Sequence, residues 1–190
     1  MKFGKSGIAL LILFFCLTAC SKENVPNRLT SLKGFVTQDN LVYHIESIER
    51  LKNIGAYDKT LFEQHTAVSQ DYDQQGNVIN GKTLLVVKVS IDNKSQKTAS
   101  LFVNGIELYK VDQQMKVDMK SRSEMEYFNR PQKSVKEFYK ADIASNTKEN
   151  YKFGYFVDDS ILDDSALCMV INPMGHQLDD KSVNFIYLNK

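Results

Sequence analysis

Residues 83–91 (TLLVVKVSI) decide the fold class of this chain. Apolar side chains recur at every second position, β-branched residues dominate, and polar Lys88 and Ser90 fall between them. Alternation with a period of two is typical of a half-buried β-strand and disfavours a helix. One face carries Leu85, Val87, Val89 and Ile91, and the turn-forming cluster 92–95 (DNKS) ends the strand. We therefore expect a central strand of a buried core.

Short stretches on both sides of this strand repeat its pattern between turn signals. Asn104-Gly105 and residues 172–175 (NPMG) mark breaks. Residues 53–68 fit either a long loop or a short helix around 61–65. The further predicted strands are 41–50, 100–103, 106–111, 125–128, 134–139, 151–157, 167–171 and 183–188.

About eight short strands separated by turns predict an all-β fold, an immunoglobulin-like antiparallel β-sandwich. We assign this domain to residues 35–190. The chain has no tryptophan, so the hallmark Trp and paired cysteines of antibody domains are absent. The sandwich prediction therefore depends on strand number and spacing.

The N-terminus has the order of a secretory signal. Lys2 and Lys5 precede an apolar run, residues 8–17 (IALLILFFCL), with no acidic residue among them. This run is about ten residues long, whereas a spanning helix needs about 20. We predict a signal peptide over residues 1–19 and a flexible, polar tether over residues 20–34.

The signal ends in Leu17-Thr18-Ala19-Cys20, which resembles the lipobox of bacterial lipoproteins. The resemblance implies that a diacylglyceryl group joins the sulfur of Cys20 and that the chain is cut before it. Two or more acyl chains hold a protein stably on a bilayer. The alternative is an ordinary secreted protein with a chance cysteine at its cleavage site. We expect a lipid anchor on Cys20 in the cell membrane or the outer membrane, outside the cytoplasm.

Charge and cysteine content narrow the function further. Loss of Lys2 and Lys5 leaves 22 basic against 23 acidic residues, so no basic surplus favours nucleic acid. The mature chain would keep Cys20 and Cys168 alone. Cys168 lies in the apolar run 166–171, where a cysteine behaves as a small buried hydrophobe. We predict a structural role for Cys168.

A wider pattern resembles a family of small bacterial lipoproteins with a telokin-like, immunoglobulin-like domain. It comprises the lipobox, the tether, Gly81-Lys82-Thr83 leading into LLVVKVSIDNKSQKTASLFVNGIELY, and the later segment EFYKADIASNTKENYKFGYFVDD. The resemblance covers residues 38–188 and implies a β-sandwich used for surface binding. Most such families have no assigned biochemical activity.

Two acidic stretches are candidate cation sites. Asp71 and Asp73 begin a segment like a calcium loop, but the position of the bidentate glutamate is Lys82. We interpret this segment as a polar loop before the strand. The second stretch has carboxylates on both sides of residues 160–162, and further acids follow at 179–180. Its candidate ligands are Asp158, Asp159, Asp163 and Asp164.

No catalytic motif stands out. His44, His65 and His176 lie far apart without zinc-ligand spacing, and no nucleophile elbow or phosphate-cradling loop occurs. Adjacent aromatic pairs occur at 127–128, 138–139 and 155–156. Neighbouring side chains on a strand point to opposite faces, so one member of each pair faces away from the core. Two interpretations are open: such aromatics form an exposed binding patch, or, as is more common, they cover the second face of the sheet.

These observations predict a membrane-anchored, extracytoplasmic, non-enzymatic binding module. Its partners would be the membrane, through lipid on Cys20, and an envelope or extracellular protein or polymer, with no cofactor and no nucleic acid. Two alternatives stay open: an accessory or immunity-type lipoprotein that blocks another envelope protein, and an envelope hydrolase.

Overall fold

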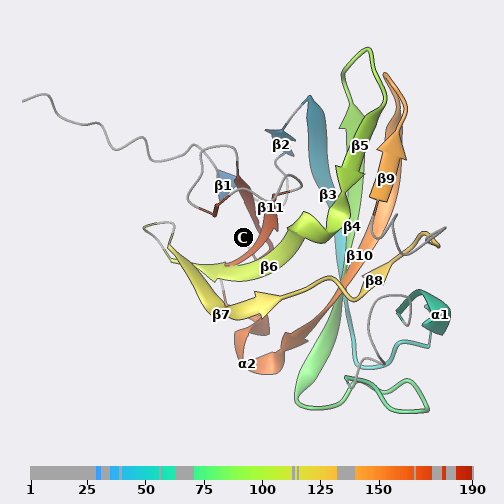
Figure 1. Cartoon of the computed structure of the whole chain (residues 1–190). Coiled ribbons are helices and arrows are strands. Elements are labelled where there is room, and N and C mark those ends of the chain that lie inside the picture. The colour runs from blue at the N-terminus through green and yellow to red at the C-terminus, as the bar shows by residue number, and fades with distance from the viewer. Residues whose placement is uncertain are drawn as a thin grey trace, which may run out of the picture.

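The computed structural model of the 190-residue chain is an all-β, antiparallel sandwich, as predicted (Figure 1). It describes residues 29–30, 35–38, 40–55, 57–62, 71–112, 114, 116–131, 140–164, 166–172, 177–178 and 183–189, the first two ranges by their backbone alone. The signal peptide, the lipobox and Cys20 lie outside the described residues. Within them, no helix is long and apolar enough to cross a membrane.

The first sheet is built around the stretch that decided the fold class. Its order is β2-β3-β4-β10-β8, with every neighbouring pair antiparallel. The central strand β4 contains the predicted stretch 83–91 and pairs along its whole length with β10. The strands are β2 (Phe35–Gln38), β3 (Leu41–Leu51), β4 (Lys82–Asn93), β10 (Lys148–Asp158) and β8 (Tyr127–Phe128).

The second sheet faces the first and has the order β1-β12-β11-β6-β7. Its strands are β1 (Leu29–Thr30), β12 (Asn184–Tyr187), β11 (Leu167–Ile171), β6 (Ile106–Val111) and β7 (Val117–Ser123). A small separate pair joins β5 (Ala99–Phe102) to β9 (Lys140–Ile143). The short helices are η1 (Val103–Gly105), α1 (Lys59–Phe62) and α2 (Asp159–Leu162).

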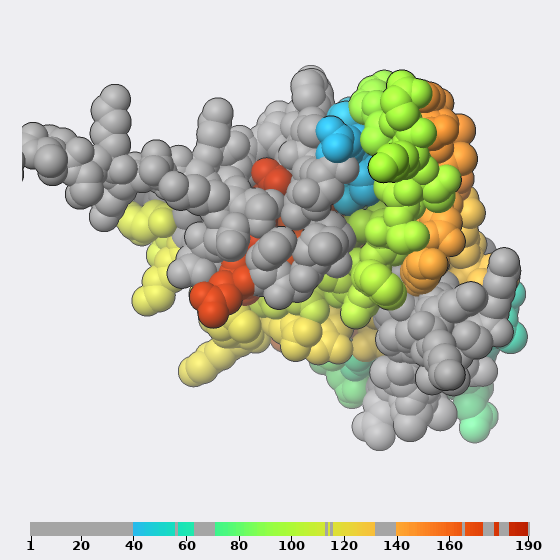
Figure 2. Space-filling view, turned by 45° about the horizontal axis from the view of Figure 1, so that its top comes forward, coloured from blue at the N-terminus to red at the C-terminus, as the bar shows by residue number. Residues whose placement is uncertain are grey.

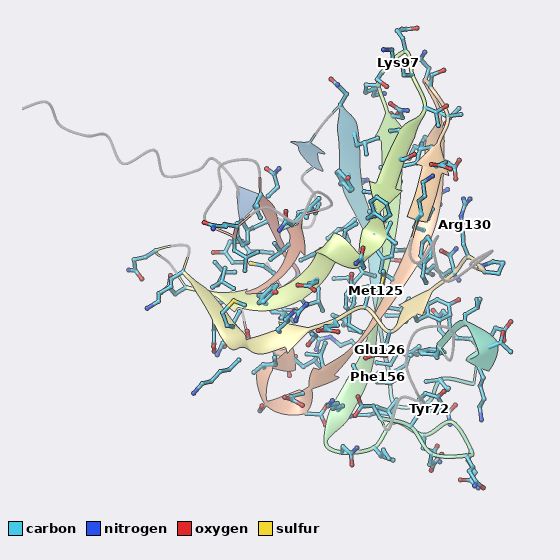
Figure 3. All side chains as sticks on the ribbon, viewed as in Figure 1. Tyr72, Lys97, Met125, Glu126, Arg130 and Phe156 are labelled. Carbon is cyan, nitrogen blue, oxygen red and sulfur yellow. The ribbon has the colours of Figure 1, made fainter. Side chains whose placement is uncertain are left out.

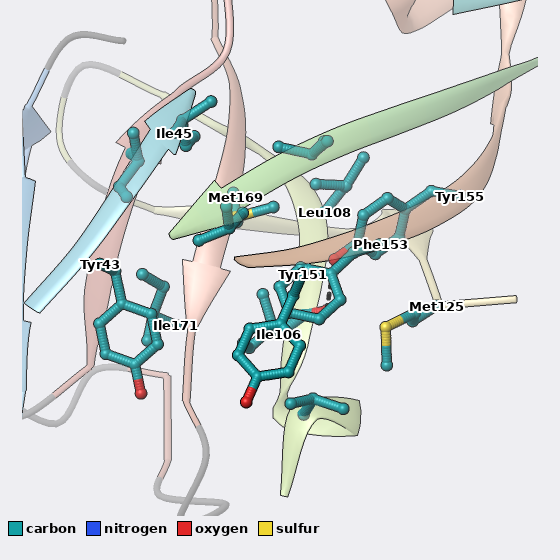
Figure 4. Packing of buried hydrophobic residues seen from close by; sticks show 14 of the residues in the cluster. Tyr43, Ile45, Ile106, Leu108, Met125, Tyr151, Phe153, Tyr155, Met169 and Ile171 are labelled. Atoms are coloured by element: carbon teal, nitrogen blue, oxygen red, sulfur yellow. Dashed lines mark hydrogen bonds between the residues drawn. The ribbon is translucent and has the colours of Figure 1, made fainter. Parts of the chain in front are cut away.

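The main core fills the space between the two sheets (Figure 4). The inward face of β10 contributes three large aromatic side chains, each at most 1% exposed. The Tyr155 hydroxyl donates a hydrogen bond of 2.9 Å to the carbonyl of Ile106, which joins β10 to the start of β6 in the other sheet. A buried hydroxyl satisfied in this way fixes how the two sheets face each other.

The two N-terminal strands, β1 and β2, belong to different sheets. β1 pairs in parallel with β12 in the second sheet, and β2 pairs with β3 in the first. Leu29 and Thr30 belong to the segment that we predicted as a flexible tether, and their pairing corrects that boundary. Two residues are too short to produce a periodic pattern, so only the neighbouring edge of β12 makes them a strand.

Residues between β3 and β4 cover one end of the first sheet on its outer side. The helix α1 lies in this segment and ends at the buried Phe62. Of the two predicted alternatives for residues 53–68, the short helix is therefore correct, two residues earlier than expected. The outer cluster comprises Ile54, Phe62, Leu84, Val86, Tyr127 and Phe156.

The second sheet also has an apolar outer face. Cys168 lies there, fully buried, as predicted from its apolar run. Burial in apolar surroundings is typical of a structural cysteine. Its buried neighbours are Tyr109, Val111, Val170, Val183, Phe185 and Tyr187.

Several predicted strands need correction. The strand expected at 100–103 is Ala99–Phe102, and only the second half of 125–128 is a strand. β7 and β9 were missed altogether. The strand expected at 134–139 lies outside the described residues.

Candidate functional site

The outer face of the first sheet divides into an apolar half and a charged half. The apolar half lies beneath α1 and the loop before β4. The strands of this sheet pair in a fixed register, which brings distant parts of the chain together in both halves. Figure 2 shows the same convergence at the strand ends near residues 40, 95 and 145. In the charged half, Ser47, Lys88 and Lys152 form one row across β3, β4 and β10, and His44, Ser90 and Asn150 form the next.

The charged half is hollowed. The volume of this depression, which we call the charged hollow, is about 560 Å³. A bulge in β3 between Ile45 and Ser47 displaces Glu46 from the regular ladder, and Glu46 lies at the rim. The hollow is lined by Glu46, Lys88, Val89, Asn129, Lys148, Asn150, Tyr151 and Lys152.

Three lysines and a single glutamate line the charged hollow, which gives it a surplus of two positive charges. Lys148 Nζ lies 3.3 Å from Glu46 Oε1. Lys88 is paired with Glu49. Lys152 Nζ lies 5.3 Å from the centre of the Tyr57 ring, and no ion pair joins it to another described residue. Lys152 is therefore the cation best placed to meet a ligand.

Glu46 is held in its ionised form. Hydrogen bonds from Ser90, Lys148 and His44 lower its pKa from the ordinary 4.5 to about 2. The His44 Nδ1 atom lies 3.3 Å from Glu46 Oε1. The charge of Glu46 therefore persists through the whole range in which proteins work, and the surplus of the hollow does not depend on its titration.

Lys88 and Lys152 occupy directly opposed positions on β4 and β10. In an antiparallel pair, opposed side chains begin about 5 Å apart, and like charges there are destabilising. Glu49 and Tyr57 compensate one lysine each, and the Tyr57 hydroxyl also donates a hydrogen bond to Glu49. The sheet thus keeps two like charges in opposed positions at the middle of an open face. Locally unfavourable arrangements of this kind are often found at functional sites.

Another hollow of similar size, about 570 Å³, lies beside β7. Its charges are Lys110 and Lys116 against three aspartates, and Lys110 Nζ lies 2.8 Å from Asp164. Its balance is therefore slightly acidic and partly neutralised by an internal ion pair. The charged hollow is the better candidate because its net charge is larger and because Lys152 has no ion pair with another described residue.

The predicted calcium-like loop is held by contacts within the protein. Asp71 Oδ2 lies 2.9 Å from Lys82 Nζ, the residue that stands where calcium would need a glutamate. Asp73 accepts a hydrogen bond of 2.8 Å from the Asn77 backbone, and hydrogen bonds from Asn77 lower its pKa. These contacts are those of a tight polar turn, as we interpreted the segment.

The second acidic stretch forms α2 and ion pairs rather than an open loop. Asp159 contacts Lys52 at 2.7 Å, Asp163 pairs with Arg50, and Asp164 pairs with Lys110. Asp158 is exposed at the start of α2. Among the residues with described positions, no group of three His, Cys, Asp or Glu side chains could hold a metal ion. Residues 179–180 are outside that set.

For the aromatic pairs that the structure describes, the binding-patch interpretation is wrong and the interpretation that aromatics cover the second face of the sheet is correct. Tyr127, Phe128, Tyr155 and Phe156 are all at most 5% exposed. Tyr127 and Phe156 do point away from the main core, but the segment before β4 covers them. Residues 138–139 lie outside the described part of the chain. The sequence signal for the actual candidate site is the set of polar positions on β4 and β10, which alternate with the core residues.

His44 lies on the charged face beside Glu46, whereas His65 and His176 are outside the described residues. The described residues therefore bring His44 close to Glu46 and do not test a site made of several histidines.

Comparisons with known proteins assign no activity to the chain. No family model matches the chain, and no curated protein matches it either. The chain is similar to three solved structures. The yjhA protein of Bacillus subtilis is 12% identical, with 83% of this chain and 97% of that one covered and a TM-score of 0.49.

The other two are an uncharacterised β-sandwich protein of Clostridium difficile 630 and a functionally unknown protein of Listeria monocytogenes EGD-e. The first is 10% identical, covers 88% of this chain and 97% of its own, and has a TM-score of 0.46. The second is 13% identical, covers 80% and 78%, and has a TM-score of 0.44. Likenesses of this size support no statement about function.

Proposed function

We propose that this chain is a lipoprotein anchored outside the cytoplasm through Cys20, and that its sandwich binds another envelope molecule without catalysing a reaction. The lipobox Leu17-Thr18-Ala19-Cys20 and the apolar run before it support the anchor. The charged hollow, left open on the outer face of the first sheet, is the observation that supports binding.

Cys20→Ala tests the anchor. The variant should lose palmitate labelling and move from the membrane fraction to the soluble fraction, because the thioether sulfur is gone. Cys168→Ala is the matched control, since Cys168 is buried and should keep both label and location. Continued labelling of the Cys20→Ala variant would show that the lipid is attached elsewhere or that the assignment is wrong.

Cross-linking in living cells tests the binding role. The full-length protein should give a cross-linked product that depends on the charged hollow and not on the hollow beside β7. Turnover of an envelope substrate by the purified protein, with no cross-linked product, would favour an enzyme instead.

A further inference from the structure

We infer that the charged hollow binds an extended anionic polymer whose charges are phosphodiesters. This inference rests on the proposed function, because it names the ligand class of the same site. The observations that carry it are the number of lysines, their spacing along the sheet and the lack of exposed apolar side chains among the described residues that line the hollow.

The spacing of the lysines favours a polymer over a single ion. Lys148 and Lys152 lie on the same face of β10, four residues apart, which corresponds to about 13 Å along a strand. Cationic side chains therefore line the hollow at both ends of this stretch of β10. Lys88, opposite Lys152, makes that end of the row the stronger one. An extended chain can place one anionic group beside Lys152, which has no ion pair with another described residue, and a later one beside Lys148.

The polar groups between the lysines suit such a chain. Asn150 stands between Lys148 and Lys152 on β10, and Asn129 lies beside Lys152. The Asn129 Oδ1 atom accepts a hydrogen bond of 2.9 Å from the Lys152 backbone, which fixes the amide at the rim. Amide N–H groups donate to phosphate oxygens, and lysine binds phosphate as a point charge.

The floor of the hollow argues against a folded protein as the occupant. Val89 and Tyr151, its apolar members, are each 1% exposed, so they offer no surface to a partner. Protein interfaces usually depend on buried aromatic or aliphatic anchors, which are lacking here. Bases of a nucleic acid would need exposed rings for stacking. A charged backbone without such groups fits the described side chains best.

The full lipidated protein in non-ionic detergent micelles, titrated with polyphosphate as the probe, tests the inference. Lys152→Gln should weaken binding about fivefold, the loss expected for one surface lysine. The slope of log affinity against log salt should fall by about 0.7. Lys120→Gln, an exposed lysine on β7 in the other sheet, is the matched control and should bind as the unchanged protein does.

Glu46→Gln makes the test two-sided. Among the described residues that line the hollow, Glu46 alone carries a carboxylate, so its loss should strengthen polyphosphate binding about fivefold, whereas a merely structural role for Glu46 predicts no gain. Melting temperatures measured on the same samples separate a change in binding from a loss of fold.

Three results would overturn the inference. The first is equal weakening by Lys152→Gln and Lys120→Gln. The second is Lys152-dependent binding to phosphatidylglycerol vesicles without binding to polyphosphate. The third is a cross-linked protein partner that depends on Lys152 when polyphosphate does not bind. The last two leave the proposed binding role standing, and failure of palmitate labelling refutes the anchor alone.

Discussion

Gly154 lies on the outer face of β10, where no side chain fits. It is opposite Tyr127 of β8 and Val86 of β4. A Cβ atom built there would lie 2.7 Å from the Tyr127 Cβ atom and 3.3 Å from Leu84 Cδ1. Its neighbour Phe156 packs in the same outer cluster. The missing side chain therefore lets β8 approach closely enough to complete that cluster.

Gly154→Ala should lower the free energy of unfolding by about 1–3 kcal/mol, the usual cost of overpacking. In an open strand the same change would be mildly stabilising, because alanine loses less backbone entropy than glycine. Urea unfolding measures the difference, with Asn150→Ala on the same face as the control. A stability equal to that of the unchanged protein would mean that Tyr127 can move away without cost.

Glu126 is a residue whose charge is poorly accommodated. One of its carboxylate oxygens is buried and has no hydrogen-bond partner among the described residues. It lies near Phe156 and Tyr72, in the lower half of the view in Figure 3. Burial raises its pKa, Asp71 and Glu124 raise it further, and Lys82 opposes them. The folded protein therefore holds this proton more tightly than the unfolded chain does.

The sign of the pH dependence follows. As pH rises above the ordinary carboxyl value of 4.5, the unfolded chain releases the proton first, so the stability contributed by this group falls. Glu126→Gln should raise the free energy of unfolding at pH 7 by about 1 kcal/mol and change it little below pH 4.5. Unfolding at both pH values, with exposed Asp158→Asn as the control, measures this. A destabilised Glu126→Gln variant at both pH values would contradict the account.

At the scale of strands, sequence periodicity predicted the strands that are buried on at least one face. β4, β10, β11 and β12 were found because apolar residues alternate or run continuously in them. β7 reads VDMKSRS, where charged residues alternate with a face that has only two apolar side chains, and its pairing with β6 is interrupted between Leu108 and Lys110. An edge strand with an irregular register has little apolar pattern, so the sequence alone could not reveal it.

The candidate site shows a similar limit. Lys88, Ser90 and Lys152 could be placed on the outer faces of their strands from alternation alone. Their convergence depends on the register that pairs Lys88 with Lys152 and on the bulge that displaces Glu46. Register and bulges are set by tertiary packing. The exposed aromatic patch failed for the same reason, because a separate segment covers the outer face.

At the scale of the molecule, the sandwich has three apolar clusters and one open charged face. The main core lies between the sheets, and each sheet carries a further cluster on its outer side. The described residues cover only half of the outer face of the first sheet. Lysines in directly opposed positions on an open face do not stabilise the sandwich. For this reason we propose a binding role for this face.

The pairing of β1 also sets how far an anchored domain can reach. In a chain held at Cys20, as proposed, the eight residues 21–28 separate the anchor from Leu29 of β1, which pairs with β12. A chain of that length spans at most about 30 Å in any conformation. The β4–β5 turn at Lys97 is at the far end of the first sheet from Tyr72 (Figure 3) and offers a site for a dye. Cys168 is buried and should not compete for it.

Energy transfer from a dye on the Lys97→Cys variant to acceptor lipids in vesicles measures this reach. Insertion of 20 Gly/Ser residues after Arg28 adds a flexible chain with an end-to-end distance of about 25 Å, so the transfer should fall. The same insertion in the β4–β5 turn, which leaves the tether unchanged, is the control. Equal transfer with and without the longer tether would show that the sandwich is held on the bilayer by its own surface.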